Sequence, residues 1–323
     1  MRWFVRFVLV LLGVGAGLWA ANTSLFSEGG ETQLLAHRGV HQTFPADGVG
    51  NDTCTAAQIH EPTHSFLENT VASMNAAFEA GADVVELDVH LTSDGQFAVF
   101  HDWTLDCRTD GTGVTHEADM AELRDLDVGY GYTADGGETF PFRGQGVGMM
   151  PTLVEVFDLF ANRQFLINFK SRRAGEGEAL AELLNGSLVA RSSTLGVYGG
   201  RPPTDAALAG VEGLRGYTRR SLLDCGKPLL ALGWSGYVPE ACRETLLVLP
   251  INIAPFVWGY PHRLTARLAE HGTSVILIGP YSGGDFSSGI DDDETLARVP
   301  NGFDGFVWTN RIEEIGPMMP ERR

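Results

Sequence analysis

Residues 84–102 read VVELDVHLTSDGQFAVFHD, and this stretch decides the fold. Two runs rich in β-branched and aromatic residues flank the turn sequence SDG, so the stretch predicts two buried strands joined by a tight turn. Carboxylates and imidazoles interrupt these strands, although a charged group is costly to bury unless something compensates it. These polar residues are Glu86, Asp88, His90, His101 and Asp102.

Apolar segments with strand character recur along the chain and alternate with segments of helical periodicity. The expected strands are residues 33–39, 82–92, 96–102, 164–171, 194–200, 244–254, 273–281 and 302–310. The expected helices are residues 68–81, 152–161, 176–187 and 261–272. This alternation predicts a parallel sheet covered by helices, and about eight strands favour a (β/α)8 TIM barrel over a doubly wound sheet.

We expect the barrel to cover residues 31–318, with loop insertions at its C-terminal face. The long polar stretches 41–66 and 103–150 are the candidates for these insertions. Residues 200–245 give no clear strand pattern.

The composition limits the classes of partner. The chain has 323 residues and a formal net charge of −18. Non-specific binding of nucleic acid needs a basic surface, so we expect no nucleic-acid partner. The same charge repels anionic substrates at long range, so an enzyme acting on phosphate would need a local cation or a cluster of Lys and Arg.

Residues 1–25 form a signal peptide or a membrane anchor. Arg2 and Arg6 precede an unbroken apolar run over residues 7–21, which is typical of a targeting segment. A retained anchor is favoured, because Leu18 or Trp19 would stand where a cleavage site needs a small residue. A buried N-terminal helix is the alternative, although the segment has no polar second face.

Both targeting interpretations place the rest of the chain outside the cytoplasm, either periplasmic or anchored to the inner membrane and facing outward. The four cysteines agree with export, because none forms a CxxC pair and their number is even. Disulfides are therefore expected, with three possible pairings, and four unpaired thiols are the alternative.

Polar residues gather where the expected strands end. The candidates on four strands are His37 and Arg38, Glu86 and Asp88, His101 and Asp102, and Lys170. Active sites of TIM barrels lie at the carboxyl ends of the strands, so these side chains are expected to converge at the barrel mouth. Side chains two residues apart share a strand face, so Glu86 and Asp88 point the same way, as do Asn168 and Lys170.

The neighbouring carboxylates of Glu86 and Asp88 predict a metal site. Two adjacent carboxylates repel each other unless a cation lies between them. Mg²⁺ or Ca²⁺ suits this position, because hard cations prefer oxygen ligands. Glu68 adds a possible third carboxylate, and Asn168 a neutral oxygen. The acidic run 291–294 is expected to be solvated or to cap a helix.

Several stretches resemble the glycerophosphodiester phosphodiesterase family, a TIM-barrel superfamily shared with phosphatidylinositol-specific phospholipases C. They follow the family order from residue 34 to residue 310. They are LLAHRG (34–39), LENT (67–70), GADVVELDVHLTSDGQFAVFHD (81–102), LDCRTDGTG (105–113), MPTLVEVF (150–157), LINFKS (166–171) and FDGFVWTN (303–310).

The resemblance implies metal-dependent hydrolysis of a glycerophosphodiester to glycerol 3-phosphate and an alcohol. It implies that His37 and His101 are the general acid–base pair. A hydroxyl of the glycerol attacks first in such a reaction, and water then opens the cyclic phosphate. Lys170 is implied as a further catalytic cation that, with Arg38, faces the phosphate.

The resemblance also assigns the metal ligands. Glu86 and Asp88 become ligands of Mg²⁺ or Ca²⁺, and Glu68 matches the family's acid near the metal. The family usually has E-x-K on the next strand, whereas this chain has Asn168-Phe169-Lys170. The expected site is therefore short of one carboxylate, with Asn168 in its place.

Residues 41–66 are a second departure, because HRG and ENT are usually much closer in the family. This insertion is expected to lie over the mouth and to carry Cys54 there. Cys107 follows the third expected strand and therefore lies at the same face. We predict the disulfides Cys54–Cys107 and Cys225–Cys242.

Two alternatives to this function stay open. The first is a phospholipase D-like or lysophospholipid-directed phosphodiesterase on the same fold, since a membrane anchor and a lid suit a lipid-derived substrate. The second is a low-activity barrel that binds a phosphorylated ligand, for which Asn168 is the supporting feature. The sequence does not indicate an oligomeric state.

Overall fold

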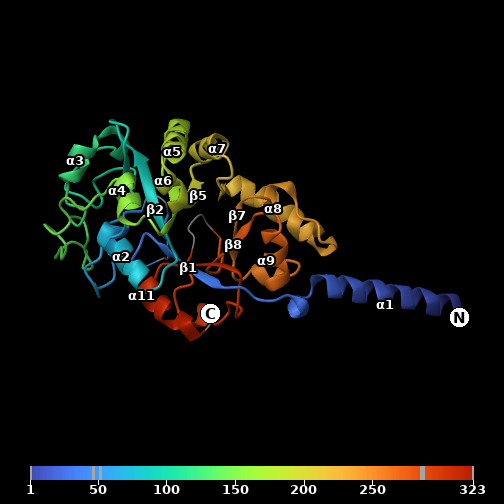
Figure 1. The fold of residues 1–323 in the computed structure, drawn as a ribbon. Coiled ribbons are helices and arrows are strands. Elements are labelled where there is room, and N and C mark those ends of the chain that lie inside the picture. The colour runs from blue at the N-terminus through green and yellow to red at the C-terminus, as the bar shows by residue number, and fades with distance from the viewer. Residues whose placement is uncertain (1, 46–47, 51–52, 284–287, 322–323) are drawn as a thin grey trace.

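The computed structural model describes residues 2–45, 48–50, 53–283 and 288–321. Helices surround a barrel of strands, and the helix α1 (Arg2–Asn22) stands away from it (Figure 1). The strands are β1 (Thr32–His37), β2 (Val84–Leu91), β3 (Phe97–Val99), β4 (Gln164–Phe169), β5 (Thr194–Gly199), β6 (Gly216–Tyr217), β7 (Leu246–Pro250), β8 (Ser274–Ile278) and β9 (Gly305–Thr309). The other α-helices are α2 (Val71–Glu79), α3 (Met120–Arg124), α4 (Leu153–Leu159), α5 (Ala174–Gly186), α6 (Leu188–Ser193), α7 (Arg201–Gly210), α8 (Arg219–Leu232), α9 (His262–Ala269), α10 (Asp293–Leu296) and α11 (Ile312–Ile315).

The parallel strands of the described chain lie in the order β6–β5–β4–β2–β1–β9–β8–β7. The edge strands β6 and β7 approach each other, because the hydroxyl of Thr245, just before β7, donates to the carbonyl oxygen of Gly216 at 2.5 Å. The fold is therefore a nearly closed (β/α)8 barrel, and the predicted fold class is confirmed.

One barrel strand differs from the prediction. Among the named strands of the described chain, β3 pairs only with β2, and it does so antiparallel. It therefore forms a hairpin arm and is not a strand of the barrel. The missing barrel strand is β6, in the stretch 200–245, and its two residues are too few to produce an alternating pattern. His101 and Asp102 consequently follow the hairpin in a loop.

Strand β2 separates two apolar cores. Val84 belongs to the core inside the barrel, together with residues of β1, β4 and β9. Val85, Leu87 and Val89 belong to the core between the sheet and the helices. Because side chains alternate along a strand, Glu86 and Asp88 share the face of Val84 and point into the barrel.

The predicted helices are confirmed as α2, α4, α5 and α9. The hydroxyls of Thr70 and Thr152 accept hydrogen bonds from the first turns of α2 and α4, which begins each helix at a Thr. Gly272 has a positive φ of 72° just beyond α9, a conformation that favours glycine at a helix end.

The two long loops pack on each other through a separate apolar core that includes Ala56, Leu105 and Tyr132. Disulfide Cys54–Cys107 joins these loops, and Cys225–Cys242 joins α8 to the turn before β7. Both predicted pairings are confirmed. The described part of the stretch 41–66 is therefore fastened, through Cys54, to the loop that follows His101 and Asp102.

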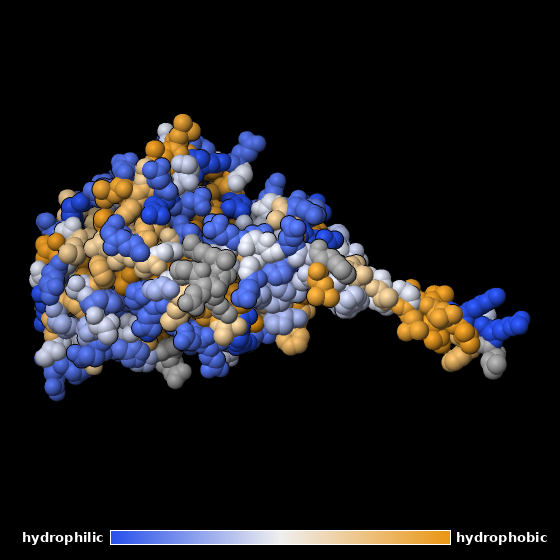
Figure 2. Space-filling model, turned by 60° about the horizontal axis from the view of Figure 1, so that its bottom comes forward, coloured by the Kyte–Doolittle hydropathy of each residue, from blue (hydrophilic) through white to orange (hydrophobic). Residues whose placement is uncertain are grey.

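Helix α1 is long and apolar enough to cross a membrane, by length and composition. None of its residues is buried against the barrel. Figure 2 shows it as an apolar projection whose far tip is hydrophilic. The alternative of a buried N-terminal helix is therefore excluded.

Candidate active site

The register of the sheet sets the first neighbours in the site. His37 lies opposite Glu86 across β1 and β2, and Asn168 lies opposite Asp88 across β2 and β4. Both acids are completely buried. The strand pairing thus brings an imidazole and an amide next to the two carboxylates that point into the barrel.

Two residues with left-handed backbones shape the floor of the site. Arg38 has a φ of 57° and Asn69 a φ of 60°, which is uncommon for residues other than glycine. The backbone N–H of Asn69 donates to the carbonyl oxygen of Arg38 at 3.0 Å, so the two conformations support each other. Gly39 completes the HRG turn, because a Cβ there would lie 2.7 Å from the backbone of Ser73.

Asp88 is surrounded by donors. Its Oδ2 accepts from Asn69 Nδ2 at 2.9 Å and lies 3.0 Å from Arg38 Nε. Its Oδ1 accepts from Asn168 Nδ2 at 2.8 Å and lies 3.5 Å from Lys170 Nζ. Burial would raise the pKa of Asp88, but Arg38 and Lys170 outweigh burial and hold that pKa well below its usual range.

Glu86 is less well compensated. Its Oε1 accepts from the hydroxyl of Tyr198 at 2.6 Å, while its buried Oε2 has no hydrogen-bond partner among the described residues. His37 Nε2 lies 3.7 Å from that oxygen. Burial and the charge of Asp88 raise the pKa of Glu86. This carboxylate therefore stands where a cation would be stabilised.

His37 is oriented by the last strand of the barrel. Its Nδ1 lies 2.6 Å from Oδ1 of Asn310, directly after β9. Asp291 fixes that amide by accepting from Asn310 Nδ2 at 2.8 Å and from its backbone N–H at 2.6 Å. Because Nδ2 is engaged with Asp291, Oδ1 faces the imidazole and requires a proton on His37 Nδ1. His37 Nε2 is then left with a lone pair.

His101 is oriented by a carboxylate. Its Nδ1 lies 2.6 Å from Asp102 Oδ1, and the other oxygen of Asp102 pairs with Arg108 Nη1. Burial, Arg38 and Lys170 lower the pKa of His101 to about 4, although Asp102 opposes them. Burial, Arg38 and His41 likewise lower the pKa of His37 well below its usual value. Both imidazoles therefore favour the neutral form in this environment.

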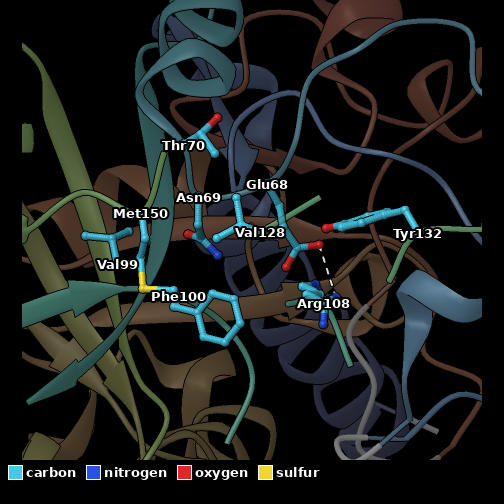
Figure 3. Close-up of a pocket in the computed structure, with 9 residues that line it drawn as sticks. All are labelled: Glu68, Asn69, Thr70, Val99, Phe100, Arg108, Val128, Tyr132 and Met150. Carbon is cyan, nitrogen blue, oxygen red and sulfur yellow. Dashed lines mark hydrogen bonds and ion pairs between the residues drawn. The ribbon is translucent and has the colours of Figure 1, made fainter. Parts of the chain in front are cut away.

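Glu68 joins the two arginines behind the site. Its Oε1 lies 3.1 Å from Arg38 Nη1, and its Oε2 lies 3.2 Å from Arg108 Nη2. Figure 3 shows the Glu68 carboxylate directed at Arg108, with the Tyr132 hydroxyl pointing toward the same pair. Burial alone would raise the pKa of Glu68, but Arg108 and Arg38 lower it to about 2.

The small pocket beside this ion pair does not hold a substrate. It has a volume of about 10 Å³, which is about enough for one water molecule. His37, His101, Glu86 and Asp88 are absent from the residues that line it. We therefore regard it as a packing gap behind the mouth.

Charge favours one divalent cation in this site. Four buried or nearly buried carboxylates, Glu68, Glu86, Asp88 and Asp102, face three permanent cations, Arg38, Arg108 and Lys170. With neutral imidazoles and an ionised Glu86 the site has one excess negative charge, which is why the pKa of Glu86 is raised while no cation is present. A divalent ion would keep Glu86 ionised and make the site positive, as an anionic phosphodiester requires.

The donor set agrees only in part with a complete metal centre. Within the described residues, no group of three or more His, Cys, Asp or Glu is arranged to hold a metal ion. The unpartnered Glu86 Oε2 beside Asp88 fits one hard cation with two carboxylates. The remaining coordination positions would then go to an amide oxygen, water and substrate.

The structure brings most predicted site residues together. Direct contacts link Glu86 and Asp88 to their neighbours in the mouth, which are His37, Arg38, Asn168 and Lys170. His101 lies beside them, because the backbone N–H of Phe100, directly before it, donates to the carbonyl oxygen of Asp88 at 3.0 Å. Glu68 instead lies behind Arg38, and both of its carboxylate oxygens are paired with arginines.

Several contributing residues were not predicted from the sequence. They are Asn69, Arg108, Tyr198, Asp291 and Asn310, together with Asp102 in its role of orienting His101. Asn69, Arg108 and Asn310 lie in stretches that carry the family resemblance, so these motifs contained the signal. The expectation that the whole acidic run 291–294 is solvated or caps a helix is wrong for Asp291, whereas Asp292 does cap α10.

Comparison with known proteins agrees with this geometry. Residues 37–192 match the sequence model of the Glycerophosphoryl diester phosphodiesterase family. A glycerophosphodiester phosphodiesterase from Caldanaerobacter subterraneus subsp. tengcongensis is 42% identical over 140 residues, which make up 43% of this chain and 45% of that protein. The chain thus matches less than half the length of that relative.

Solved structures share the fold of the whole barrel. The glycerophosphoryl diester phosphodiesterase domain of Rv2277c from Mycobacterium tuberculosis superposes with a TM-score of 0.62 at 18% identity, covering 89% of this chain and 99% of that one. A phosphodiesterase from Oleispira antarctica, in complex with the product sn-glycerol-3-phosphate, gives 0.54 at 19% identity and covers 90% and 100%. Likeness at these identities concerns the fold alone, whereas the sequence match over residues 37–192 includes both imidazoles and both buried acids. Over residues 37–192 the chain therefore matches the glycerophosphoryl diester phosphodiesterase family.

Proposed function

We propose that the protein hydrolyses a glycerophosphodiester to glycerol 3-phosphate and an alcohol. The observation that carries this proposal is the clustering of His37, Lys170 and the buried pair Glu86 and Asp88. His101 joins this cluster because the backbone N–H of Phe100, directly before it, donates to the carbonyl oxygen of Asp88 at 3.0 Å. The family match and the product named for the Oleispira antarctica phosphodiesterase support the same substrate class.

The two imidazoles would act as general base and general acid. His37 holds its proton on Nδ1 toward Asn310, so Nε2 is free to accept the proton of an attacking glycerol hydroxyl. His101 would give a proton to the leaving alkoxide, which needs its protonated form. Asp102 favours that form against the burial, Arg38 and Lys170 that lower the pKa of His101, and the negative charge of a bound phosphodiester would favour it further. Water then opens the cyclic phosphate with the two roles exchanged.

Fixed positive charge would neutralise the phosphate. Lys170 is the better exposed cation, with 20% of its side chain accessible, whereas Arg38 is nearly buried between Glu68 and Asp88. We propose that Lys170 contacts the phosphate directly. Arg38 adds positive potential and holds Asp88 in place.

A divalent cation, Mg²⁺ or Ca²⁺, would be held by Glu86 and Asp88. Asn168 would add its amide oxygen by turning the amide whose Nδ2 now donates to Asp88. Such an ion polarises a phosphoryl oxygen and offsets negative charge. Glu68 is better assigned to holding the two arginines, because both of its oxygens are already paired. Because Asn168 stands where the family's E-x-K pattern has a glutamate, this metal centre has one charged ligand fewer.

Metal binding can be measured without turnover. Isothermal titration calorimetry of the full chain with Mg²⁺ and with Ca²⁺ is expected to give one site. Asn168→Glu should tighten that site by about tenfold or more, because a third carboxylate raises the ligand charge. Equal or weaker binding by Asn168→Glu would remove Asn168 from the proposed ligand set.

We further propose that α1 is a retained anchor and that the barrel lies outside the cytoplasm. The exposed apolar helix and the two disulfides support this location. Intact-mass analysis of protein from the membrane fraction is expected to find the N-terminal residues present. A mass that lacks them would identify a cleaved signal peptide instead.

The decisive assay uses the full chain with glycerophosphocholine and with lysophosphatidylcholine, each with and without a chelator. Release of glycerol 3-phosphate and choline from the first substrate, lost with chelator and restored by metal, is the expected result. Preference for the lysolipid would support the lipid-directed alternative, and absence of turnover on both would support a binding role. His271→Ala, two residues beyond α9 and outside the site, is the matched control and should keep full activity.

A further inference from the structure

Helix α1 is attached to one flank of the barrel. Asn22 Nδ2 donates to the carbonyl oxygen of Trp234 at 2.8 Å, and Arg267 Nη2 donates to the carbonyl oxygen of Ala21 at 3.3 Å. Ser24 Oγ donates to the carbonyl oxygen of Gly259 at 3.0 Å. The C-terminal end of α1 is therefore fixed to the face formed by α8, α9 and the turns beside them (Figure 1).

Four aromatic side chains lie exposed on the turns of this flank. The flank cluster consists of Trp234, Tyr237, Phe256 and Trp258, which are 42%, 50%, 77% and 43% exposed. The indole N–H of Trp258 donates to the carbonyl oxygen of Leu230 at 3.0 Å, and the same ring packs against Gly233, directly before Trp234. Trp258 and Trp234 thus come from distant parts of the chain to one surface.

Single exposed apolar residues are normal on a soluble protein and need no explanation. The flank cluster differs because it is aromatic and adjoins a helix that can cross a bilayer. Helix α1 has 21 residues, which extend over about 31 Å at 1.5 Å per residue and match the hydrocarbon core of a bilayer. Trp and Tyr are the residues enriched at the level of lipid headgroups, since their rings are amphipathic.

We propose that this flank rests on the membrane surface, with α1 in the bilayer and the flank cluster among the lipid headgroups. The proposal rests on the membrane attachment proposed above and does not depend on the catalytic assignment. A bilayer is favoured over a protein partner because Asn22 bonds Trp234 directly, which puts the cluster where the membrane surface must lie if α1 crosses the membrane.

This arrangement also orients the barrel. Trp234 lies in the connection from α8 to β7, and such connections occupy the amino ends of the strands. The catalytic residues occupy the carboxyl ends, which is the opposite end of a TIM barrel. Phe256 and Trp258, however, lie in the connection from β7 to α9, which starts at the carboxyl ends, and the indole N–H of Trp258 reaches the carbonyl oxygen of Leu230 in α8. The membrane contact therefore runs along the side of the barrel between α8 and α9, and not across one of its ends.

The test is hydroxyl-radical footprinting of the full chain in phosphatidylcholine nanodiscs, read by mass spectrometry. Trp103 is 42% exposed, like Trp234, but lies on the loop after the β3 hairpin and is the internal control. After correction for intrinsic reactivity, Trp234 and Trp258 should be oxidised at least about threefold more slowly than Trp103. Equal oxidation of these three residues would overturn the proposal, whether or not the enzyme is active.

A variant separates lipid contact from simple packing. Trp234→Glu with Trp258→Glu should lift the flank from the headgroups and raise the oxidation of Tyr237 and Phe256 in nanodiscs by about threefold. Trp103→Glu is the matched control and should leave both unchanged. Unchanged oxidation of Tyr237 and Phe256 in the double variant, with a native circular dichroism spectrum, would contradict the contact.

Discussion

His37 and His101 occupy one site but are held by different parts of the molecule. His37 is supported by a neutral amide, Asn310, that follows the last strand of the barrel and is fixed by Asp291. His101 is supported by a carboxylate, Asp102, on a loop that is fixed by Arg108. The first support belongs to the barrel frame, and the second belongs to the loops packed over it.

The difference indicates where the site is vulnerable. Arg108 also holds Glu68 and donates to the hydroxyl of Thr55 at 2.7 Å, and both Arg108 and Thr55 adjoin the disulfide Cys54–Cys107. The support of His101 therefore depends on buried charge and on a covalent link, whereas the support of His37 depends on strand packing. Changes in the loops should affect His101 first.

The largest expected effect is the loss of either imidazole. His37→Ala and His101→Ala should each lower kcat/KM on glycerophosphocholine by about 10²–10⁴-fold, because each removes one proton-transfer group. Far-ultraviolet circular dichroism should show an unchanged fold. Near-normal rates in both purified variants would refute the acid–base assignment. The difference between the supports of His37 and His101 would then have no meaning for catalysis.

The next effect concerns the charge support of His101. Arg108→Met leaves Asp102 and Glu68 as buried carboxylates without their shared partner, which should lower the free energy of unfolding by about 3–5 kcal/mol. The control is Arg124→Met, because Arg124 pairs with Glu155 on the surface and such pairs contribute about 0–1 kcal/mol. Urea unfolding of both variants measures the difference, and equal losses would show that the buried network is not important for stability.

The same network gives a pH dependence with a definite sign. Glu68 has its pKa lowered to about 2 in the folded protein, compared with about 4.3 in an unfolded chain. Its contribution is therefore complete above about pH 4.3 and is lost as the pH falls toward 2. The stability gap between the native protein and Arg108→Met should narrow over that window.

The two disulfides test whether the loops support His101. Cys54→Ser with Cys107→Ser should lower kcat by about tenfold, since it loosens the segment that positions Arg108 and hence Asp102. Cys225→Ser with Cys242→Ser removes a link between α8 and the turn before β7 and should leave kcat unchanged while lowering stability by about 2–4 kcal/mol. Similar kcat values for the two variants would remove the proposed link between the loop disulfide and catalysis.

The features of the site that could be predicted from the sequence are those that depend on local sequence patterns. Glu86 and Asp88 follow from strand alternation, and the disulfides follow from the topology of a barrel with an insertion. The pairing of Asp291 with Asn310 joins residues from a loop and a strand end, and no local period connects them. Strand β6 was missed for a related reason, because two residues form a strand only through their neighbours β5 and β7.

The smallest expected effect lies at the neutral support. Asp291→Asn keeps the shape but allows the amide of Asn310 to rotate, so that His37 Nδ1 faces a donor for part of the time. We expect kcat to fall by only about three- to tenfold with KM unchanged, because the barrel frame still positions the ring. Asp102→Asn makes the matching change at His101 and should lower kcat further, since it also removes the charge that stabilises the protonated imidazole and partners Arg108. A larger loss of kcat in Asp291→Asn than in Asp102→Asn would show that the support of His37 by Asn310 is the more important one. His37 would then be the general acid and His101 the general base.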